Sequence, residues 1–506
     1  MTFRTACALF VVVGHAAACV REFPNEPAKS VTIQSVSWPT ELHVTDVDTL
    51  ELDVHLQGSS TSVTGLRVTW QSSSDAILTV VPLQPDGGAS REDTLVAQLR
   101  AVVTARTGGW DTVTVIVEGG AAFQRMESQR AIRVTQKWRS VSAGMGHTCA
   151  VTVDSSAYCW GEGERGALGT GRPIDGLVPT RVIGLGDLKF MGVSAGDEAT
   201  CGFIAEFVAY CWGSGTQGRL GNGDRSEAMQ FVPGPVVGPT FHTLSAGRAT
   251  CGVSEESIAF CWGSNAAGQL GVRSGVVPPL DTCLDGTLCS LAPRKVTASA
   301  STALSYLTIV VGGAHTCGIA LAPQPGLAFC WGTSTAGALG NADTTISGTP
   351  VAVAGGLHFR SLSAGRDHTC GLTTDSLSYC WGANAEGQLG NATMSPSLIP
   401  VIVPGPKLRS VSAGGDHTCG IATNGAAWCW GQGSSGQLGN DSLNRKSTPA
   451  PVAGGLDFES ISAGTFHTCG VVVGGALYCW GQGVGGRLGS EPPVDRSKPT
   501  RASEPH

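Results

Sequence analysis

The sequence is organised around the stretch Cys159-Trp160-Gly161-Glu162-Gly163-Glu164-Arg165-Gly166-Ala167-Leu168-Gly169. Its repeated part is Cys-Trp-Gly, followed five residues after its glycine by Gly-x-Leu-Gly, and it occurs seven times. Each copy is preceded by Thr-Cys and followed by a proline that opens a short apolar run. The seven copies begin at Cys159, Cys211, Cys261, Cys330, Cys380, Cys429 and Cys479. One structural unit is therefore repeated seven times.

The length of the unit predicts its architecture. Successive Thr-Cys cysteines lie 49 to 66 residues apart, and each unit holds short β-rich segments separated by Gly, Asp, Ser and Asn. A period near fifty with several short strands is typical of a β-propeller rather than of a helical solenoid. We expect an all-β, seven-bladed propeller with four-stranded antiparallel blades over residues 137–502.

The cysteines of each unit are spaced for cross-strand disulfides. Six units place them ten residues apart, and the fourth unit, with Cys317 and Cys330, adds three residues at a proline-rich tip. A short hairpin sets two such residues opposite each other on antiparallel strands, within reach of a bridge. On the chain-entropy model, each bridge stabilises the fold by roughly 2 to 3 kcal/mol. The expected pairs are Cys149–Cys159, Cys201–Cys211, Cys251–Cys261, Cys317–Cys330, Cys370–Cys380, Cys419–Cys429 and Cys469–Cys479, with Cys283–Cys289 as an eighth.

Zinc is the alternative use of regularly spaced cysteines. A metal site needs close ligands with further ligands converging on them, and a ten-residue spacing in separate blades does not converge. We expect no metal and no cofactor.

The first 18 residues are typical of a secretory signal peptide. They contain Arg4, an apolar run from Ala6 to Val13, and the small residues Ala16-Ala17-Ala18. The site before Cys19 resembles the bacterial lipoprotein box, in which the cysteine is acylated, although that family usually has Leu where Ala16 stands. Cys7 would be removed with the signal peptide and the other cysteines would pair, so Cys19 would have no partner. Acylation would modify this unpaired cysteine.

These features predict an extracytoplasmic, bacterial cell-envelope lipoprotein attached to a membrane through Cys19. It would lie in the outer membrane if the host has one. Simple secretion is the alternative. Residues 19–29 are polar and contain prolines, as expected of a tether.

Residues 30–136 form a separate region of alternating strands. The segment Val68 to Asp75, with Trp70 and a run of serines, resembles the Trp-Ser-Ser-Asp segment of bacterial immunoglobulin-like domains. That resemblance implies an immunoglobulin-like β-sandwich. The region contains no cysteine, so its core would lack an inter-sheet disulfide.

The repeat region resembles the regulator of chromosome condensation repeat family over its whole length. The matching residues are His-Thr before the first cysteine, Trp-Gly after the second, Gly-x-Leu-Gly and the proline-led strand. The resemblance implies a seven-bladed propeller that acts as a binding platform. The nuclear member of that family acts on a small GTPase, which a secreted protein with paired cysteines would not meet, so we expect no nucleotide exchange.

The charge balance excludes one class of partner. The chain has 32 basic and 39 acidic residues, a net charge of −7, and no basic run. Binding to nucleic acid requires a concentrated positive surface. We therefore expect no nucleic-acid partner.

A histidine recurs at one position of the repeat. It is present as His147, His315, His368, His417 and His467, and alanine replaces it at Ala199 and Ala249. A ring of imidazoles could bind metal or shuttle protons. We interpret it instead as a histidine that hydrogen-bonds a turn, repeated because the blade is repeated. The acidic residues lie in different blades with no nucleophile set apart from the repeat, so we assign no catalytic residue.

The variable turns indicate a binding surface. In an antiparallel four-stranded blade, the turns after the first and third strands lie on the same edge, and their residues differ while the surroundings repeat. Tolerance of variation at solvent is the alternative explanation. The candidates there are Asp197, Glu198, Arg248, Arg366, Asp367, Asp416 and Phe466.

The third repeat adds a further candidate. An insertion before its proline-led strand contains Cys283 and Cys289, which enclose Leu284 and Asp285. A stapled loop loses little entropy when a partner binds it. Protection from proteases explains the staple equally well.

These observations predict a monomeric, non-enzymatic binding scaffold for a protein or glycan partner at the cell surface. Two alternatives stay open. One is a propeller enzyme that processes extracellular polysaccharide or peptide, and the other is a structural surface adhesin.

Overall fold

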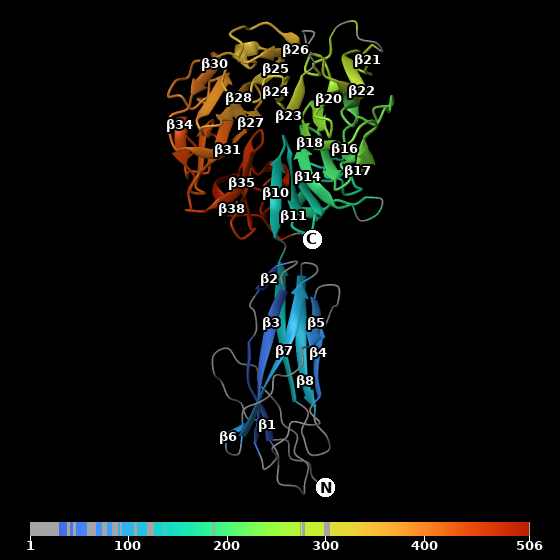
Figure 1. Cartoon of the computed structure of the whole chain (residues 1–506), viewed down its shortest axis with the longest axis vertical. Helices are drawn as coiled ribbons and strands as arrows, with labels where there is room; N and C mark the ends of the chain where they lie inside the picture. The colour runs from blue at the N-terminus through green and yellow to red at the C-terminus, as the bar shows by residue number, and fades with distance from the viewer. Residues whose placement is uncertain are drawn as a thin grey trace. The chain divides into compact units, whose positions relative to one another are not determined.

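The computed structural model describes residues 137–504, apart from 185, 187, 274, 276–278 and 298–303, together with the backbone of nine strands between Ser30 and Thr135 (Figure 1). The chain divides into two units, Met1–Lys137 and Trp138–His506. The predicted signal peptide, Cys19 and the tether lie outside the described residues.

The described strands of the first unit form two sheets. One has the order β1-β3-β7-β5 with β6 paired to β7, and the other has the order β2-β9-β8-β4. The immunoglobulin-like assignment of residues 30–136 stays a prediction, because the side chains that would form its core are outside the described part of the chain. The strands are β1 (Ser30–Ser37), β2 (Glu41–His43), β3 (Val47–Gln57), β4 (Arg67–Ser72), β5 (Leu78–Pro82), β6 (Ser90–Arg91), β7 (Thr94–Ala105), β8 (Gly109–Glu118) and β9 (Met126–Thr135).

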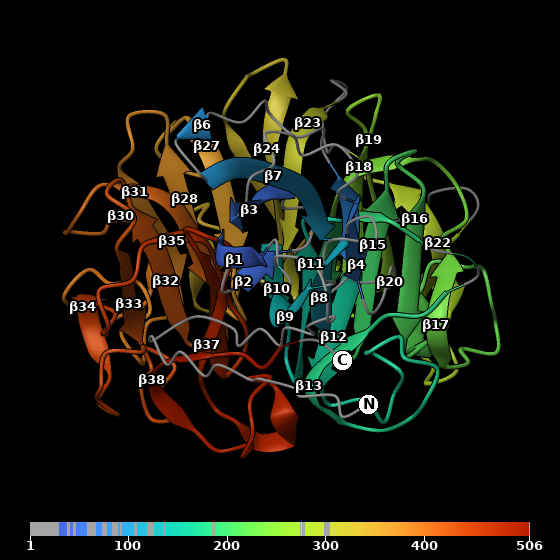
Figure 2. The same ribbon diagram turned by 90° about the horizontal axis from the view of Figure 1, so that it is seen from below.

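The second unit is the predicted seven-bladed propeller, and Figure 2 shows its blades arranged in a ring. Each of blades 1 to 7 is an antiparallel sheet of consecutive strands, and blade 3 carries one extra strand. The first strands line the ring axis: β10 (Trp138–Ala143), β14 (Phe190–Ala195), β18 (Phe241–Ala246), β23 (Ser305–Val311), β27 (Phe359–Ala364), β31 (Leu408–Ala413) and β35 (Phe458–Ala463).

The second and third strands of each blade form the stapled hairpin. The second strands are β11 (His147–Thr152), β15 (Ala199–Ile204), β19 (Ala249–Ser254), β24 (His315–Ala322), β28 (His368–Thr373), β32 (His417–Ala422) and β36 (His467–Val472). The third strands are β12 (Ala157–Gly161), β16 (Ala209–Gly213), β20 (Ala259–Ser264), β25 (Ala328–Gly332), β29 (Ser378–Gly382), β33 (Ala427–Gly431) and β37 (Leu477–Gly481).

The fourth strands are the proline-led runs on the outside of the ring. They are β13 (Gly176–Arg181), β17 (Gln230–Pro235), β22 (Leu288–Lys295), β26 (Ser347–Ala352), β30 (Ser397–Ile402), β34 (Lys446–Pro451) and β38 (Arg496–Arg501). Proline is tolerated there because an edge strand need not donate every backbone N–H. The extra strand of blade 3 is β21 (Asp281–Thr282), and three short 3₁₀ turns follow third strands at η1 (Thr216–Gly218), η2 (Thr335–Gly337) and η3 (Val484–Gly486).

Eight disulfides join the cysteine pairs that the spacing predicts. In each repeat the two cysteines face each other across the second and third strands, as Cys419 faces Cys429. The repeat cysteines are fully buried, between the blades rather than on the surface. So many bridges indicate that the protein folds in an oxidising, extracytoplasmic compartment.

The hydrophobic core lies at the boundaries between neighbouring blades, which we call seams. Cys149, Val151 and Leu168 of blade 1 pack against Phe190 and Trp212 of blade 2, and each later seam repeats this arrangement. At every seam the tryptophan of Cys-Trp-Gly is fully buried. A blade therefore cannot bury its apolar surface without its neighbours.

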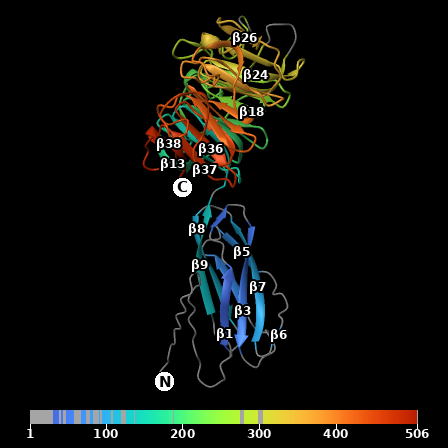
Figure 3. The same ribbon diagram turned by 90° about the vertical axis from the view of Figure 1, so that its left-hand side faces the viewer.

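The ring closes without exchanging a strand. Blade 1 begins at β10 and blade 7 ends at its own fourth strand, so closure depends on contacts between the two blades, which lie side by side in Figures 2 and 3. Ser462 Oγ accepts the N–H of Ala143 at 2.9 Å, and Trp160 Nε1 donates to the carbonyl of Arg487 at 3.0 Å. The same two bonds recur at most other seams, so the seventh seam is an ordinary one.

Candidate functional site

The turns after the seven first strands surround one opening of the central channel, which we call the mouth. The cavity there has a volume of about 400 Å³ and its wall consists largely of Ala and Gly. The glycines are required: a Cβ on Gly365 would lie 2.4 Å from the carbonyl oxygen of Gly414 and from Cε1 of His368. The wall of the mouth is therefore made of small residues, and only the side chains of the variable turns project from it.

Backbone hydrogen bonds hold these turns together around the mouth. Each joins an N–H of one blade to a glycine carbonyl of the next. Five such bonds of 3.1 Å join Met145 to Gly196, Gly313 to Gly365, Arg366 to Gly414, Gly415 to Gly464, and Thr465 to Gly144. The turns thus form a fixed rim.

Four of the predicted binding residues, Asp197, Arg248, Arg366 and Asp367, bring charge to this rim. Asp197 accepts from Nε of Arg248 at 3.2 Å across the seam between blades 2 and 3. Arg366 reaches Asp367 at 3.1 Å and Asp416 of the next blade at 2.7 Å. Both arginines are more than half exposed, so their guanidinium groups face solvent while their partners hold them in place.

Asp416 is mostly buried below Arg366, and Gln388 Nε2 approaches the same carboxylate at 3.4 Å. Burial raises the pKa of this carboxyl, and the charge of Arg366 opposes the shift. Since Arg366 and Gln388 occupy its oxygens, Asp416 positions the arginine.

Glu198 lies beside the mouth, in a second cavity of about 350 Å³ that also contains Asp197. Its carboxylate receives Arg165 at 3.2 Å and the buried Arg219 at 3.3 Å. Arg165 belongs to the turn after a third strand, so first and third turns meet at one edge, as the strand order predicts.

The rim formed by blades 7 and 1 is less polar. Phe466 is half-buried and lines the mouth together with Thr465. Met145 follows it around the rim and is exposed. Met145 lies in the variable first turn of blade 1, although it is not among the binding residues that the sequence predicts.

Leu284 and Asp285 are not among the residues that line the mouth. They belong to a short hairpin of blade 3 that packs beside blade 2. Asp285 accepts from Gln217 Nε2 at 2.6 Å, and this hydrogen bond, with those from Thr287, holds its pKa below the usual range. Leu284 is 74% exposed, and Leu288 of the same hairpin, which the sequence did not single out, is 52% exposed.

The interpretation of the repeated histidine is wrong in one respect. Its backbone carbonyl closes the local turn, but its imidazole crosses the seam: Nε2 of His417 lies 2.9 Å from Thr468 Oγ1 in the next blade. The same contact is made by His147 with Thr200, His315 with Thr369, His368 with Thr418, and His467 with Thr148.

The threonine hydroxyl fixes the tautomer of this histidine. Thr418 Oγ1 donates to the carbonyl of Gln388 at 2.9 Å, so it must accept from Nε2–H of His368. Burial lowers the pKa of His368 and of His417 to about 3, and that of His147 and His315 to about 4. These imidazoles are neutral at physiological pH and bind neighbouring blades together.

Two further features concern the described residues only. They contain no group of three or more His, Cys, Asp or Glu side chains arranged to hold a metal ion. Among them, no helix has the length and apolar character needed to cross a membrane.

The geometry defines the class of protein: a disulfide-stapled, seven-bladed β-propeller with a variable rim around a small-residue channel. Two family models of the Regulator of chromosome condensation (RCC1) repeat match parts of the chain, so the chain carries RCC1 repeats. One model matches residues 138–167, 359–388, 408–437 and 458–487, and the other matches 154–202, 325–372, 377–421 and 424–471. Together these matches cover residues 138–202 and 325–487.

Relatives of known sequence match short parts of the chain. The ultraviolet-B receptor UVR8 of Arabidopsis thaliana is 32% identical over 104 residues, which are 21% of this chain and 23% of the receptor. The human E3 ubiquitin-protein ligase HERC2 is 34% identical over 85 residues, which are 16% of this chain and 2% of the ligase. The chain thus spans less than a quarter of either relative.

Solved structures show the same fold. Prp20p of Saccharomyces cerevisiae, described with its binding to Gsp1p and histones, is 19% identical, with a TM-score of 0.59 over 73% of this chain and 88% of that one. Yeast RCC1 (Prp20) in a complex with Kap60 is 19% identical, with a TM-score of 0.58 over 73% and 85%.

Proposed function

We propose that the protein is a non-enzymatic binding scaffold that recognises a protein partner at the mouth of its propeller, outside the cytoplasm. The observation that carries the proposal is the convergence of seven variable turns on one cavity of about 400 Å³ within an otherwise repeated framework. Residues on such a rim can be substituted without disturbing the buried seams. The similar propeller Prp20p binds Gsp1p and histones, which supports a protein as the class of partner.

The rim offers two kinds of contact. Arg248 and Arg366 present guanidinium groups held by carboxylates, and arginine is enriched among residues that dominate binding energy. Phe466 and Met145 offer an apolar contact on the part of the rim formed by blades 7 and 1. Leu284 and Leu288 form a second, separate apolar contact, on a rigid hairpin.

The site has the features of recognition rather than of catalysis. The carboxylates of Asp197, Asp367 and Asp416 are each engaged by an arginine. A general acid or base must be free to exchange a proton with a bound substrate. A glycan partner would give a different result in the experiment that follows.

The experiment uses the full-length protein, immobilised and incubated with the cell-envelope fraction of its source cell. Arg248→Glu combined with Arg366→Glu should remove a captured protein, because both charges on the rim are reversed. Arg172→Glu is the matched control, since Arg172 is exposed outside the mouth. Identical captured proteins for all variants would contradict the mouth as the site. Capture that survives protease but not glycosidase treatment would favour a glycan.

A further inference from the structure

Two seams lack the histidine that joins the other blades. Ala199 and Ala249 occupy the histidine position in blades 2 and 3, so Thr250 and Thr316 receive no imidazole from the preceding blade. Thr250 Oγ1 retains its bond to the carbonyl of Arg219, at 3.4 Å. The seams on either side of blade 3 therefore lack a buried hydrogen bond that the other five seams have.

The insertion of blade 3 folds into a stapled hairpin at one of these seams. Asp281 pairs with Cys289 and Thr282 with Leu288, while Gly286, at φ 81°, forms the turn. Cys283 and Cys289 are buried together with Leu291, whereas Leu284 and Leu288 are exposed. The bridge fixes the backbone of a loop that has only two residues in its first strand.

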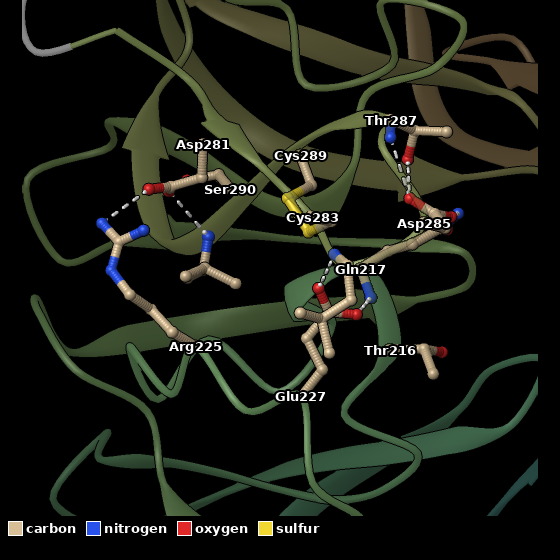
Figure 4. Close-up of a disulfide and its surroundings, with 12 residues drawn as sticks. Thr216, Gln217, Arg225, Glu227, Asp281, Cys283, Asp285, Thr287, Cys289 and Ser290 are labelled. Carbon is tan, nitrogen blue, oxygen red and sulfur yellow. Dashed lines mark hydrogen bonds and ion pairs between the residues drawn. A yellow bond between two sulfur atoms is a disulfide. The ribbon is translucent and has the colours of Figure 1, made fainter.

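This hairpin is bound to blade 2 through several side chains (Figure 4). Glu227 accepts from the backbone N–H of Leu284 and, with its other oxygen, from the backbone N–H of Gln217, both at 2.6 Å. Gln217 Nε2 in turn donates to Asp285 at 2.6 Å. Arg225 adds an ion pair with Asp281 at 3.3 Å. Glu227, Gln217 and Arg225 all belong to blade 2.

The backbone of Glu227 has a conformation that surrounding contacts must hold in place. Its φ is 51°, in the left-handed region that costs a non-glycine residue of order 1 kcal/mol or more. Surrounding contacts must hold such a conformation, and the two charge-assisted bonds to backbone N–H groups do so here. The carboxylate thus joins Gln217 of η1 in blade 2 to the stapled hairpin of blade 3.

We propose that the stapled hairpin is a clamp that holds blade 3 against blade 2 where the seam histidine is missing. The disulfide keeps the N–H of Leu284 in place for Glu227, and Asp285 positions the loop through Gln217. Across the same seam, Arg248 of blade 3 meets Asp197 of blade 2 at the mouth. Asp285 is therefore a positioning residue. The exposed face of the hairpin carries Leu284 and Leu288.

Amide hydrogen exchange of the full-length protein tests the clamp. Glu227→Ala should speed exchange in β18 and β19 by about tenfold, the effect of losing the charge-assisted hydrogen bond that crosses from Glu227 to Leu284 of blade 3, while exchange in blade 6 stays unchanged. Glu386→Ala is the matched control. Glu386 also joins neighbouring blades, through Arg445 at 3.7 Å, but at a seam that retains His368 and Thr418.

A second variant tests the reason for the clamp. Ala199→His places an imidazole opposite Thr250, as in the other seams, and should restore slow exchange in the Glu227→Ala background. If Glu227→Ala does not fold, Gln217→Ala provides the milder form of the same test. Unchanged exchange in blade 3 after Glu227→Ala, an equal effect of Glu386→Ala, or failure of Ala199→His to restore protection would each overturn the proposal.

Discussion

The repeated threonine and tryptophan each donate a hydrogen bond to the neighbouring blade, and one carbonyl in each blade accepts both. The variable residue of Gly-x-Leu-Gly accepts both the tryptophan N–H and the threonine O–H of the next blade, as Gln388 accepts from Trp430 and Thr418 at 2.9 Å. Only the backbone of that residue takes part, so its side chain is free to vary. The side chains of the threonine and tryptophan are fully buried and therefore repeat.

The threonines allow a matched comparison at this scale. Thr418→Val should lower the free energy of unfolding by about 1 to 3 kcal/mol, because Nε2–H of His368 loses its acceptor inside the protein. The loss of unfolding free energy in Thr250→Val should be smaller than in Thr418→Val by about 1 kcal/mol or more, since no histidine faces Thr250 and only its own donated bond is lost. Denaturant unfolding of both variants measures the difference. Equal losses would show that the histidine contact contributes nothing.

The hairpin of the second and third strands is the repeated element, and its stability depends on the disulfide. Cys419 and Cys429 are paired in register and fully buried. Even the longer fourth hairpin keeps the same pairing, with Cys317 opposite Cys330, because the three additional residues are placed in the connecting loop. The element tolerates insertions at its tip for this reason.

Removing one bridge tests this element. Cys419→Ala with Cys429→Ala should lower the free energy of unfolding by about 2 to 5 kcal/mol, through the larger entropy of the unfolded chain and the lost buried sulfur. Thermal unfolding of the variant, with and without reductant, gives the measurement. Intact mass under non-reducing conditions should also show the loss of two hydrogens for each of the eight bridges. Free thiols at the repeat cysteines would contradict the oxidised state.

Over the whole ring, stability depends on the protonation of the seam histidines. Burial lowers the pKa of each: to about 4 for His147 and His315, to about 3 for His368 and His417, and well below the usual value for His467. As pH falls below about 6.5, the unfolded chain binds protons that the folded protein cannot accept. The stabilisation present above pH 6.5 is therefore lost progressively as the pH approaches 4.

The expected outcome is a falling melting temperature between pH 7 and pH 5, a window that lies above most carboxyl titrations. The limit is about 1.4 kcal/mol per pH unit for each histidine. His417→Gln should flatten the profile, because glutamine can donate to Thr468 but does not titrate. His358→Gln is the control, since His358 is exposed and its imidazole contacts the carbonyl of Pro325 rather than a buried threonine. A flat profile in the unaltered protein would contradict this account.

The sequence alone determined the seven units, their four-stranded blades and the pairing of the cysteines, because those features depend on spacing along the chain. It also indicated the turns that form the rim, since the strand order of an antiparallel blade places alternate turns at one edge. Only the tertiary structure decided what joins the blades. The contacts of His417 with Thr468 and of Glu227 with Leu284 connect residues 51 and 57 positions apart, across seams that no local pattern records. The structure also decided that Asp285 binds Gln217 and that Leu288 faces solvent, because burial depends on where the hairpin packs and not on its own sequence.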